Sequence, residues 1–105
     1  MNELKVALHP EADKEILEAL RFYRDRKPGL DSRLLSEIEQ LKAKLLKQPR
    51  RCGFIEEPLR CCRLARFPFG LVYHVTEAEI FIVALMHWKR RPGYWKSRLP
   101  ETPAL

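Results

Sequence analysis

Hydrophobic residues in the first half of the chain recur at intervals of three and four, the spacing of one face of an α-helix. The first such stretch predicts a helix from about Pro10 to Arg26. The pattern restarts at Leu30, and this second helix should end before Pro49. Because only Lys27-Pro28-Gly29 separates the two stretches, we expect an antiparallel helical hairpin.

Alternating or β-branched segments flank this hairpin and predict strands. Leu4 to Leu8 alternates with polar or small residues and should form a strand that ends at His9. The segment from Pro49 to Pro58 is typical of a loop. Three more strands are predicted after it, the last two joined by a hairpin turn at Thr76-Glu77-Ala78: Leu59 to Ala65, Leu71 to Val75 and Glu79 to Met86.

The predicted order of elements is βααβββ, which indicates an α+β fold with a small antiparallel sheet packed against the helical hairpin. The strand from Glu79 to Met86 is apolar on both faces, so we expect the hairpin to cover one side and another segment to cover the other. His87 to Arg98 should form a loop or short helical turn. We expect one domain over residues 1–98 and a flexible tail over residues 99–105.

The composition fits one globular domain that does not enter a membrane. The chain has 105 residues, of which 46% are hydrophobic and 32% charged, a size that supports one core. Its longest apolar run, Ile80 to Met86, is far shorter than the roughly 20 residues that a membrane span requires. The first residues lack the pattern of a secretory signal, so we expect a cytoplasmic protein.

The three cysteines give little reason to expect a disulfide. Their number is odd, and two of them, Cys61 and Cys62, are adjacent, a spacing that rarely suits disulfide geometry. Together with His74 or His87 they do not reproduce a common zinc-site spacing such as paired C-x-x-C motifs. We therefore expect Cys52, Cys61 and Cys62 to be reduced thiols, and we expect no metal and no cofactor.

Positive charge is concentrated in the second half of the chain. Residues 1–46 carry nine basic and nine acidic side chains, whereas residues 47–98 carry eleven basic and four acidic ones. This asymmetry, within a formal net charge of +6, indicates a polyanionic partner. The alternative is a solvated basic surface that only keeps the protein soluble.

Several sequence features follow one another in a specific order between Leu4 and Arg98. The first feature is the predicted order of elements. The others are the helix from Ala12 to Tyr23, the motif Arg66-Phe67-Pro68-Phe69 that leads into Val72 to Val75, and the run from His87 to Trp95. Together they resemble the RelE/ParE superfamily of toxins from type II toxin-antitoxin systems. The resemblance implies an α-hairpin on a small antiparallel sheet, a cognate antitoxin as partner, and the function of a growth inhibitor.

Two activities are open within this superfamily. RelE-like members cut mRNA in the ribosomal A site, whereas ParE-like members inhibit DNA gyrase without being hydrolases. A third reading is a family member that has lost its activity and only binds its antitoxin. The sequence therefore leaves open whether the chain is an enzyme that cuts mRNA. It also leaves open whether the target is the ribosome with its mRNA or DNA gyrase.

Metal-free RNA cleavage would need proton transfer and phosphate stabilisation, and four residues are candidates for these roles. His87 is the best candidate for proton transfer, because an imidazole exchanges protons near neutral pH. Arg63 and Arg66 could donate forked hydrogen bonds to phosphate oxygens. Tyr94 could donate a hydrogen bond or stack on a base. We expect these side chains to converge in one basic hollow beside the sheet.

The family resemblance carries over to these positions in part. His87 resembles the histidine of several ribosome-dependent relatives, and Tyr94 resembles the C-terminal tyrosine of some members. Arg63 or Arg66 resembles the strand arginine that faces the scissile phosphate. The lysine cluster that some RelE-type nucleases place before this arginine is missing, since Arg60-Cys61-Cys62 stands there. Either Glu56 or Glu57 is an alternative carboxylate base, as in other relatives.

Six further basic residues are candidates for contact with RNA or a protein partner: Arg60, Lys89, Arg90, Arg91, Lys96 and Arg98. Structural roles are the alternative for the candidate site. His87 could fix the terminal segment by a hydrogen bond, and Arg66 could pair with a helix carboxylate. The aromatic residues Trp88, Tyr94 and Trp95 could cover the open face of the sheet.

Overall fold

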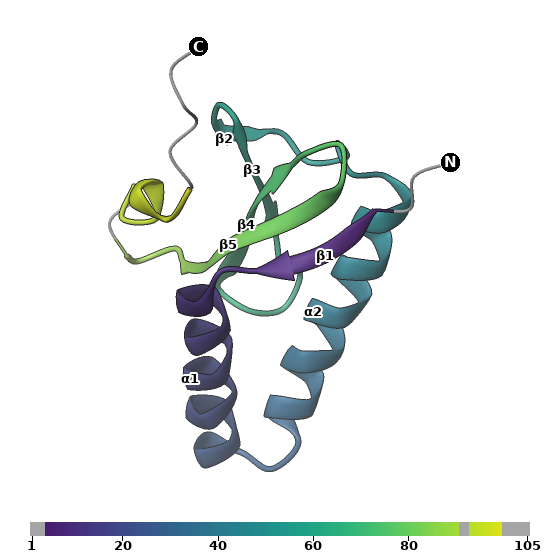
Figure 1. Ribbon diagram of the computed structural model, residues 1–105. Coiled ribbons are helices and arrows are strands. Elements are labelled where there is room, and N and C mark those ends of the chain that lie inside the picture. The colour runs from purple at the N-terminus through teal and green to yellow at the C-terminus, as the bar shows by residue number, and fades with distance from the viewer. Residues whose placement is uncertain (1–3, 91–92, 100–105) are drawn as a thin grey trace.

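The computed structural model describes residues 4–90 and 93–99, and it contains two helices, a five-stranded sheet and a terminal 3₁₀ turn (Figure 1). The strand order is β1-β5-β4-β3-β2, with β1 parallel to β5 and the other neighbours antiparallel. The α+β class is as predicted. The elements are β1 (Lys5–Leu8), α1 (Pro10–Arg26), α2 (Leu30–Lys47), β2 (Phe54–Glu56), β3 (Leu59–Arg63), β4 (Phe69–Val75), β5 (Glu79–His87) and η1 (Lys96–Arg98).

Both helices match the predicted spans, and the sheet has one strand more than expected. The short strand β2 lies inside the predicted loop from Pro49 to Pro58, where it pairs with β3 at the edge of the sheet. Three residues are too few to show a period of two, and the flanking Gly53 and Pro58 are typical of loops. Within the described ranges, no helix is both long and apolar enough to cross a bilayer.

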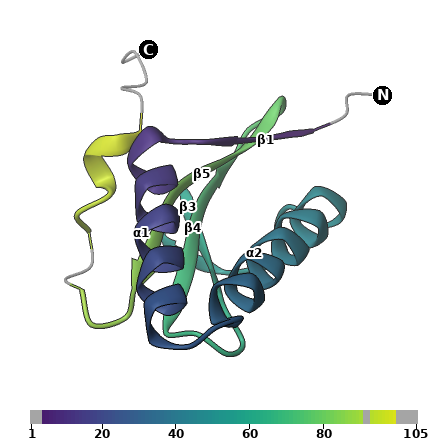
Figure 2. The same cartoon turned by 90° about the horizontal axis from the view of Figure 1, so that it is seen from below.

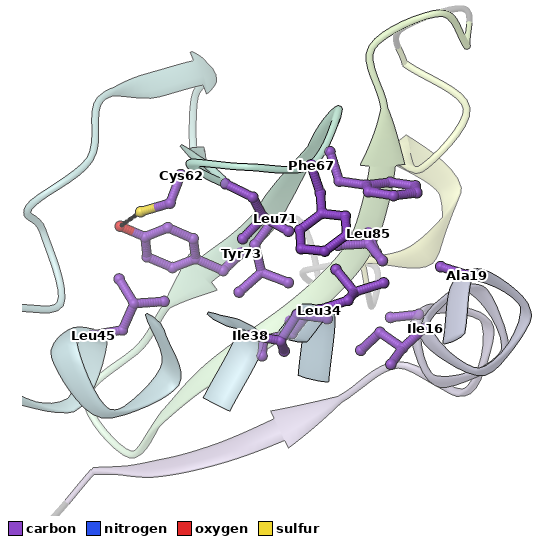
Figure 3. Close-up of a cluster of buried hydrophobic side chains, with 14 of the residues drawn as sticks. Ile16, Ala19, Leu34, Ile38, Leu45, Cys62, Phe67, Leu71, Tyr73 and Leu85 are labelled. Carbon is purple, nitrogen blue, oxygen red and sulfur yellow. Dashed lines mark hydrogen bonds between the residues drawn. The ribbon is translucent and has the colours of Figure 1, made fainter. Parts of the chain in front are cut away.

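The helical hairpin covers one face of the sheet, which we call the hairpin face. The inner stripes of both helices, including Ile16 and Ile38, pack there against alternate residues of β4 and β5 such as Leu71 and Leu85 (Figure 3). Tyr73 is fully buried in the same cluster. The hydrophobic periodicity of the sequence is thus realised as the main core of the molecule.

The opposite face, which we call the far face, is covered by residues 93–99. The side chain of Trp95 is 1% exposed and packs with Val72, Val83 and Met86. Its indole Nε1 lies 3.3 Å from the Met86 sulfur. Both faces of β5 are therefore buried, as its uninterrupted apolar sequence predicted. In Figure 2, the terminal segment lies beside the first turns of α1.

The cysteines correct one sequence-based prediction, because Cys52 and Cys62 form a disulfide. Adjacent residues of a strand point to opposite faces. On β3, Cys62 points to the hairpin face, toward the loop that carries Cys52, whereas Cys61 belongs to the far face and keeps a free thiol. The Cα atoms of Cys52 and Cys62 are 5.5 Å apart, within the usual range for a disulfide. The expectation of three reduced thiols was wrong because it did not consider this alternation.

Candidate functional site

His87 ends β5 and lies on the hairpin face. Its ring meets Phe69 edge-on, with the ring centroids 5.1 Å apart, and its Nδ1 accepts a hydrogen bond of 3.0 Å from the backbone N–H of Lys89. This bond uses the lone pair of Nδ1 and fixes the imidazole at the start of the terminal segment. His87 borders a hollow of about 220 Å³ with the α1 residues Glu15 and Glu18.

Arg63 ends β3 and lies on the other face. Residues paired across antiparallel strands share a face, and the register pairs Arg63 with Gly70 but His87 with Phe69. Since Phe69 and Gly70 are neighbours along β4, the side chains of Arg63 and His87 are directed to opposite faces. The Arg63 guanidinium lies 4.7 Å from the ring centroid of Trp88, which is 37% exposed.

Glycine at position 70 makes the Arg63 end of the sheet possible. A Cβ atom there would lie 2.6 Å from the Cys61 sulfur and 2.9 Å from Cζ2 of Trp88. Both distances are shorter than real Cβ contacts, so glycine is needed at this position for the Trp88 ring to lie against β4 beside Arg63. Burial raises the pKa of the Cys61 thiol to about 11, so this sulfur is not a reactive thiolate at neutral pH.

Arg66 occupies a third place, in the loop between β3 and β4. It lines a groove of about 470 Å³ along α2, which we call the α2 groove: Ser32, Arg33, Ser36, Glu37, Gln40, Ala65 and Arg66. A carboxylate oxygen of Glu37 accepts hydrogen bonds from the backbone N–H groups of Ala65 and Arg66 and holds the loop against α2. A smaller recess of about 170 Å³ lies beside this groove, where the end of β3 at Arg63 meets Lys44 of α2, although the Arg63 guanidinium itself lies beside Trp88.

Tyr94 belongs to a cluster that fastens the terminal segment to α1, the C-terminal latch: Glu15, Arg90, Tyr94 and Arg98. Arg98 donates to both carboxylate oxygens of Glu15 at 2.8 and 3.2 Å, and Arg90 donates to one at 3.2 Å. The side chains of Arg98 and Glu15 are only 11% and 12% exposed. Glu15 also accepts a bond from the N–H of Leu85, so the latch joins helix, sheet and terminal segment.

Both arginines of the latch lie close to the tyrosine ring. The guanidinium carbons of Arg90 and Arg98 are 3.5 and 5.0 Å from the Tyr94 ring centroid. The Tyr94 hydroxyl is buried and has no hydrogen-bond partner among the described residues. Burial, followed by the negative charge of Glu15, raises the pKa of Tyr94 to about 12. This phenol therefore stays protonated at neutral pH, inside a structural cluster.

The other basic candidates are divided among several internal contacts. Arg60 donates a bond of 2.8 Å to the carbonyl of Cys52, and Lys96 forms an exposed ion pair of 3.0 Å with Glu56. The side chain of Lys89 is exposed, and Arg91 lies outside the described residues. The prediction that the catalytic candidates converge in one hollow was wrong: His87 and Tyr94 border the same hollow, but Arg63 and Arg66 do not.

Glu15 is the structural residue that the sequence reasoning missed. It lies three residues after Ala12 and four before Ala19, both buried, so its position on the inner stripe of α1 was readable from the sequence. A carboxylate on an inner stripe indicates a buried cationic partner. Within the described ranges, no three His, Cys, Asp or Glu side chains are grouped as metal ligands would be.

The comparisons with known proteins agree with this fold. The sequence model described as "ParE toxin of type II toxin-antitoxin system, parDE" matches residues 6–92. A solved structure from the chromosomal ParDE toxin-antitoxin system of P. aeruginosa superimposes with a TM-score of 0.70 at 19% identity, covering 81% of this chain and 96% of that one. The search of curated proteins found no match. The chain belongs to the ParE toxin family, and so to the toxins of type II toxin-antitoxin systems.

Proposed function

We propose that this toxin arrests growth by binding DNA gyrase in the cytoplasm and is not itself a hydrolase. One observation carries the proposal beyond family membership: the strand register directs His87 and Arg63 to opposite faces of the sheet. Proton transfer and phosphate stabilisation must act on the same few atoms, so a nuclease needs these groups within hydrogen-bond reach of one phosphate.

Several of the remaining nuclease candidates are engaged in structural contacts. The arginines of the C-terminal latch are held by Glu15, the Tyr94 ring packs against these arginines, and the Nδ1 of His87 accepts a backbone hydrogen bond. The alternative carboxylate Glu56 pairs with Lys96. These contacts support a protein-binding toxin over a ribosome-dependent mRNA endonuclease.

The surface of the helical hairpin supports a protein target as well. Four large apolar side chains on its helices are between 42% and 51% exposed: Leu17, Phe22, Leu35 and Leu46. Exposed apolar side chains of this size are suited to burial in a protein-protein interface. The cognate antitoxin is the second partner that we propose, and its acidic side chains would be attracted by the net charge of +6.

A supercoiling assay with purified gyrase tests the target. We expect the toxin to inhibit supercoiling and the cognate antitoxin to restore it. A double variant, His87→Gln with Arg63→Gln, should inhibit as well as the wild type, because neither residue has a catalytic role in a binding toxin. Unimpaired gyrase at excess toxin, together with codon-registered cuts in cellular transcripts, would replace this proposal with the endonuclease. Normal growth of cells that express the toxin alone would instead indicate an inactive family member.

A further inference from the structure

The disulfide between Cys52 and Cys62 ties the segment after α2 to the sheet. Cys62 lies on β3 and is 2% exposed, whereas Cys52 lies in the loop before β2 and is partly exposed. The Tyr73 hydroxyl is 4.0 Å from the Cys62 sulfur, so the buried half of the bond ends in the main core (Figure 3). The bond therefore joins a buried residue, Cys62, to the less buried Cys52.

Noncovalent contacts hold the same loop in place beside the disulfide. The Arg60 guanidinium donates to the carbonyl of Cys52 at 2.8 Å and to that of Arg50 at 3.4 Å. It also lies 4.1 Å from the ring centroid of Phe54, and the N–H of Cys61 donates to the carbonyl of Gly53 at 3.1 Å. These contacts do not involve sulfur, so reduction does not remove them directly; in the loosened loop they should still keep the two thiols near enough to pair again.

We propose that Cys52 and Cys62 form a reversible thiol-disulfide site that locks residues 48–56 onto the sheet when oxidised. Disulfides that form in reducing compartments are mostly transient or redox-sensing, which fits a toxin that we place in the cytoplasm. The proposal does not depend on whether the target is gyrase or the ribosome.

The chemistry is an exchange with a low-molecular-weight thiol. A thiolate attacks the sulfur of Cys52, the less buried of the two residues, the S–S bond breaks, and Cys62 leaves as a thiolate that takes up a proton. A second small thiolate attacks the outer sulfur of the mixed disulfide and releases Cys52. Overall, two small thiols are oxidised to their disulfide and the protein disulfide is reduced to two thiols. The reverse exchange, with a small-molecule disulfide as oxidant, reforms the bond.

Reduction should loosen the far face as well as the loop. Strand β2 has only three residues, and its Ile55 packs against the far-face cluster that contains Trp95. The next residue, Glu56, pairs with Lys96 of the terminal segment. Because the disulfide stabilises one end of β2, its loss should weaken the contacts that β2 makes with the far-face cluster and the terminal segment.

Thermal unfolding with and without dithiothreitol tests the site on the full chain. We expect reduction to lower the Tm of the wild type by about 10 °C, from the loop entropy that the bond removes in a domain of this size. Cys61→Ser is the matched control and should respond like the wild type. Cys52→Ser should have the low Tm in both conditions. An equal Tm for oxidised and reduced wild type, or alkylation showing that Cys61 is the consumed thiol, would overturn the proposal.

A redox titration tests the positioning role of Arg60. The titration uses buffers with graded ratios of oxidised to reduced dithiothreitol. The Arg60→Met variant should be half reduced at a ratio several-fold higher than the wild type, because Cys52 is no longer held near Cys62. Hydrogen exchange should show the amides of Phe54 to Glu56 exchanging at least tenfold faster after reduction, with those of α1 unchanged. An unchanged midpoint in the variant would remove Arg60 from the mechanism, and unchanged exchange in β2 would refute the lock itself.

Discussion

The two faces of the sheet are covered by different means. The hairpin face is closed by two long helices whose inner stripes place many medium-sized apolar side chains on β4 and β5. The far face is closed by residues 93–99, which contribute one buried indole and are anchored by the ion pairs of Lys96 and Arg98. The hairpin face therefore has redundancy in its packing, whereas the far face depends on a few residues.

The largest expected effect is the loss of the indole on the far face. Trp95→Ala should lower the free energy of unfolding by about 3–5 kcal/mol, because the side chain is almost fully buried against Val83 and Met86. Urea unfolding measures the change. Trp88→Ala is the matched control and should cost about 1 kcal/mol, since Trp88 is 37% exposed. Equal costs for the two tryptophans would contradict the dependence of the far face on one residue.

The second effect concerns the C-terminal latch. Glu15→Ala should cost about 2–4 kcal/mol, because it leaves the nearly buried Arg98 without its carboxylate and the N–H of Leu85 without an acceptor. Glu18→Ala, at an exposed position of the same helix, should cost less than about 0.5 kcal/mol.

A double variant separates the ion pair from simple packing. If Arg98 destabilises the Glu15→Ala protein by being buried and uncompensated, then adding Arg98→Met should recover part of the loss. Chemical unfolding of all four proteins completes the cycle. Strictly additive costs would show that the two side chains are not coupled and that the latch is not a unit.

The third effect arises where Trp88 crosses β4. Gly70→Ala should cost about 1–3 kcal/mol, since the new methyl group would lie 2.6 Å from the Cys61 sulfur and 2.9 Å from the Trp88 ring. In a Cys61→Ala background the cost should be smaller, because the closer of the two contacts is gone. Thermal unfolding of the four proteins measures this difference. An identical cost of Gly70→Ala in both backgrounds would mean that a contact other than the Cys61 sulfur causes the destabilisation.

Sequence reasoning predicted the hairpin face better than the far face for a physical reason. Helical periodicity and the apolar run of β5 are local patterns, so both helices and the double burial of β5 followed from them. The sequence indicated that Trp88, Tyr94 or Trp95 could cover the far face, and the structure gives this role to Trp95. The pairing of Cys52 with Cys62, however, depends on which segments are neighbours. The same holds for the candidate site, because the separation of His87 from Arg63 follows from the register of β4 with both its neighbours. Glu15 was the exception, since its place on the inner stripe of α1 is local information.

The smallest effect is expected at the hydroxyl of Tyr94, the buried polar atom of the latch without a described partner. Tyr94→Phe should stabilise the protein by about 0.5–1 kcal/mol at pH 7, because a buried hydroxyl without a partner costs free energy. The advantage should grow above pH 10. There, the unfolded wild type loses the phenol proton at its usual pKa of 10, while the pKa of about 12 keeps the folded form protonated, so folding of the wild type weakens as pH rises.

The free energy of unfolding, measured at pH 7 and pH 11 for the wild type and Tyr94→Phe, tests whether the stability difference grows with pH. Tyr23 and Tyr73 also have pKa values that burial raises, but they are present in both proteins and cancel in the comparison. A stability difference that stays constant between the two pH values would mean that Tyr94 ionises equally in the folded and unfolded chain. The latch would then be open to solvent around the phenol, and the far face would resemble an ordinary protein surface at that end.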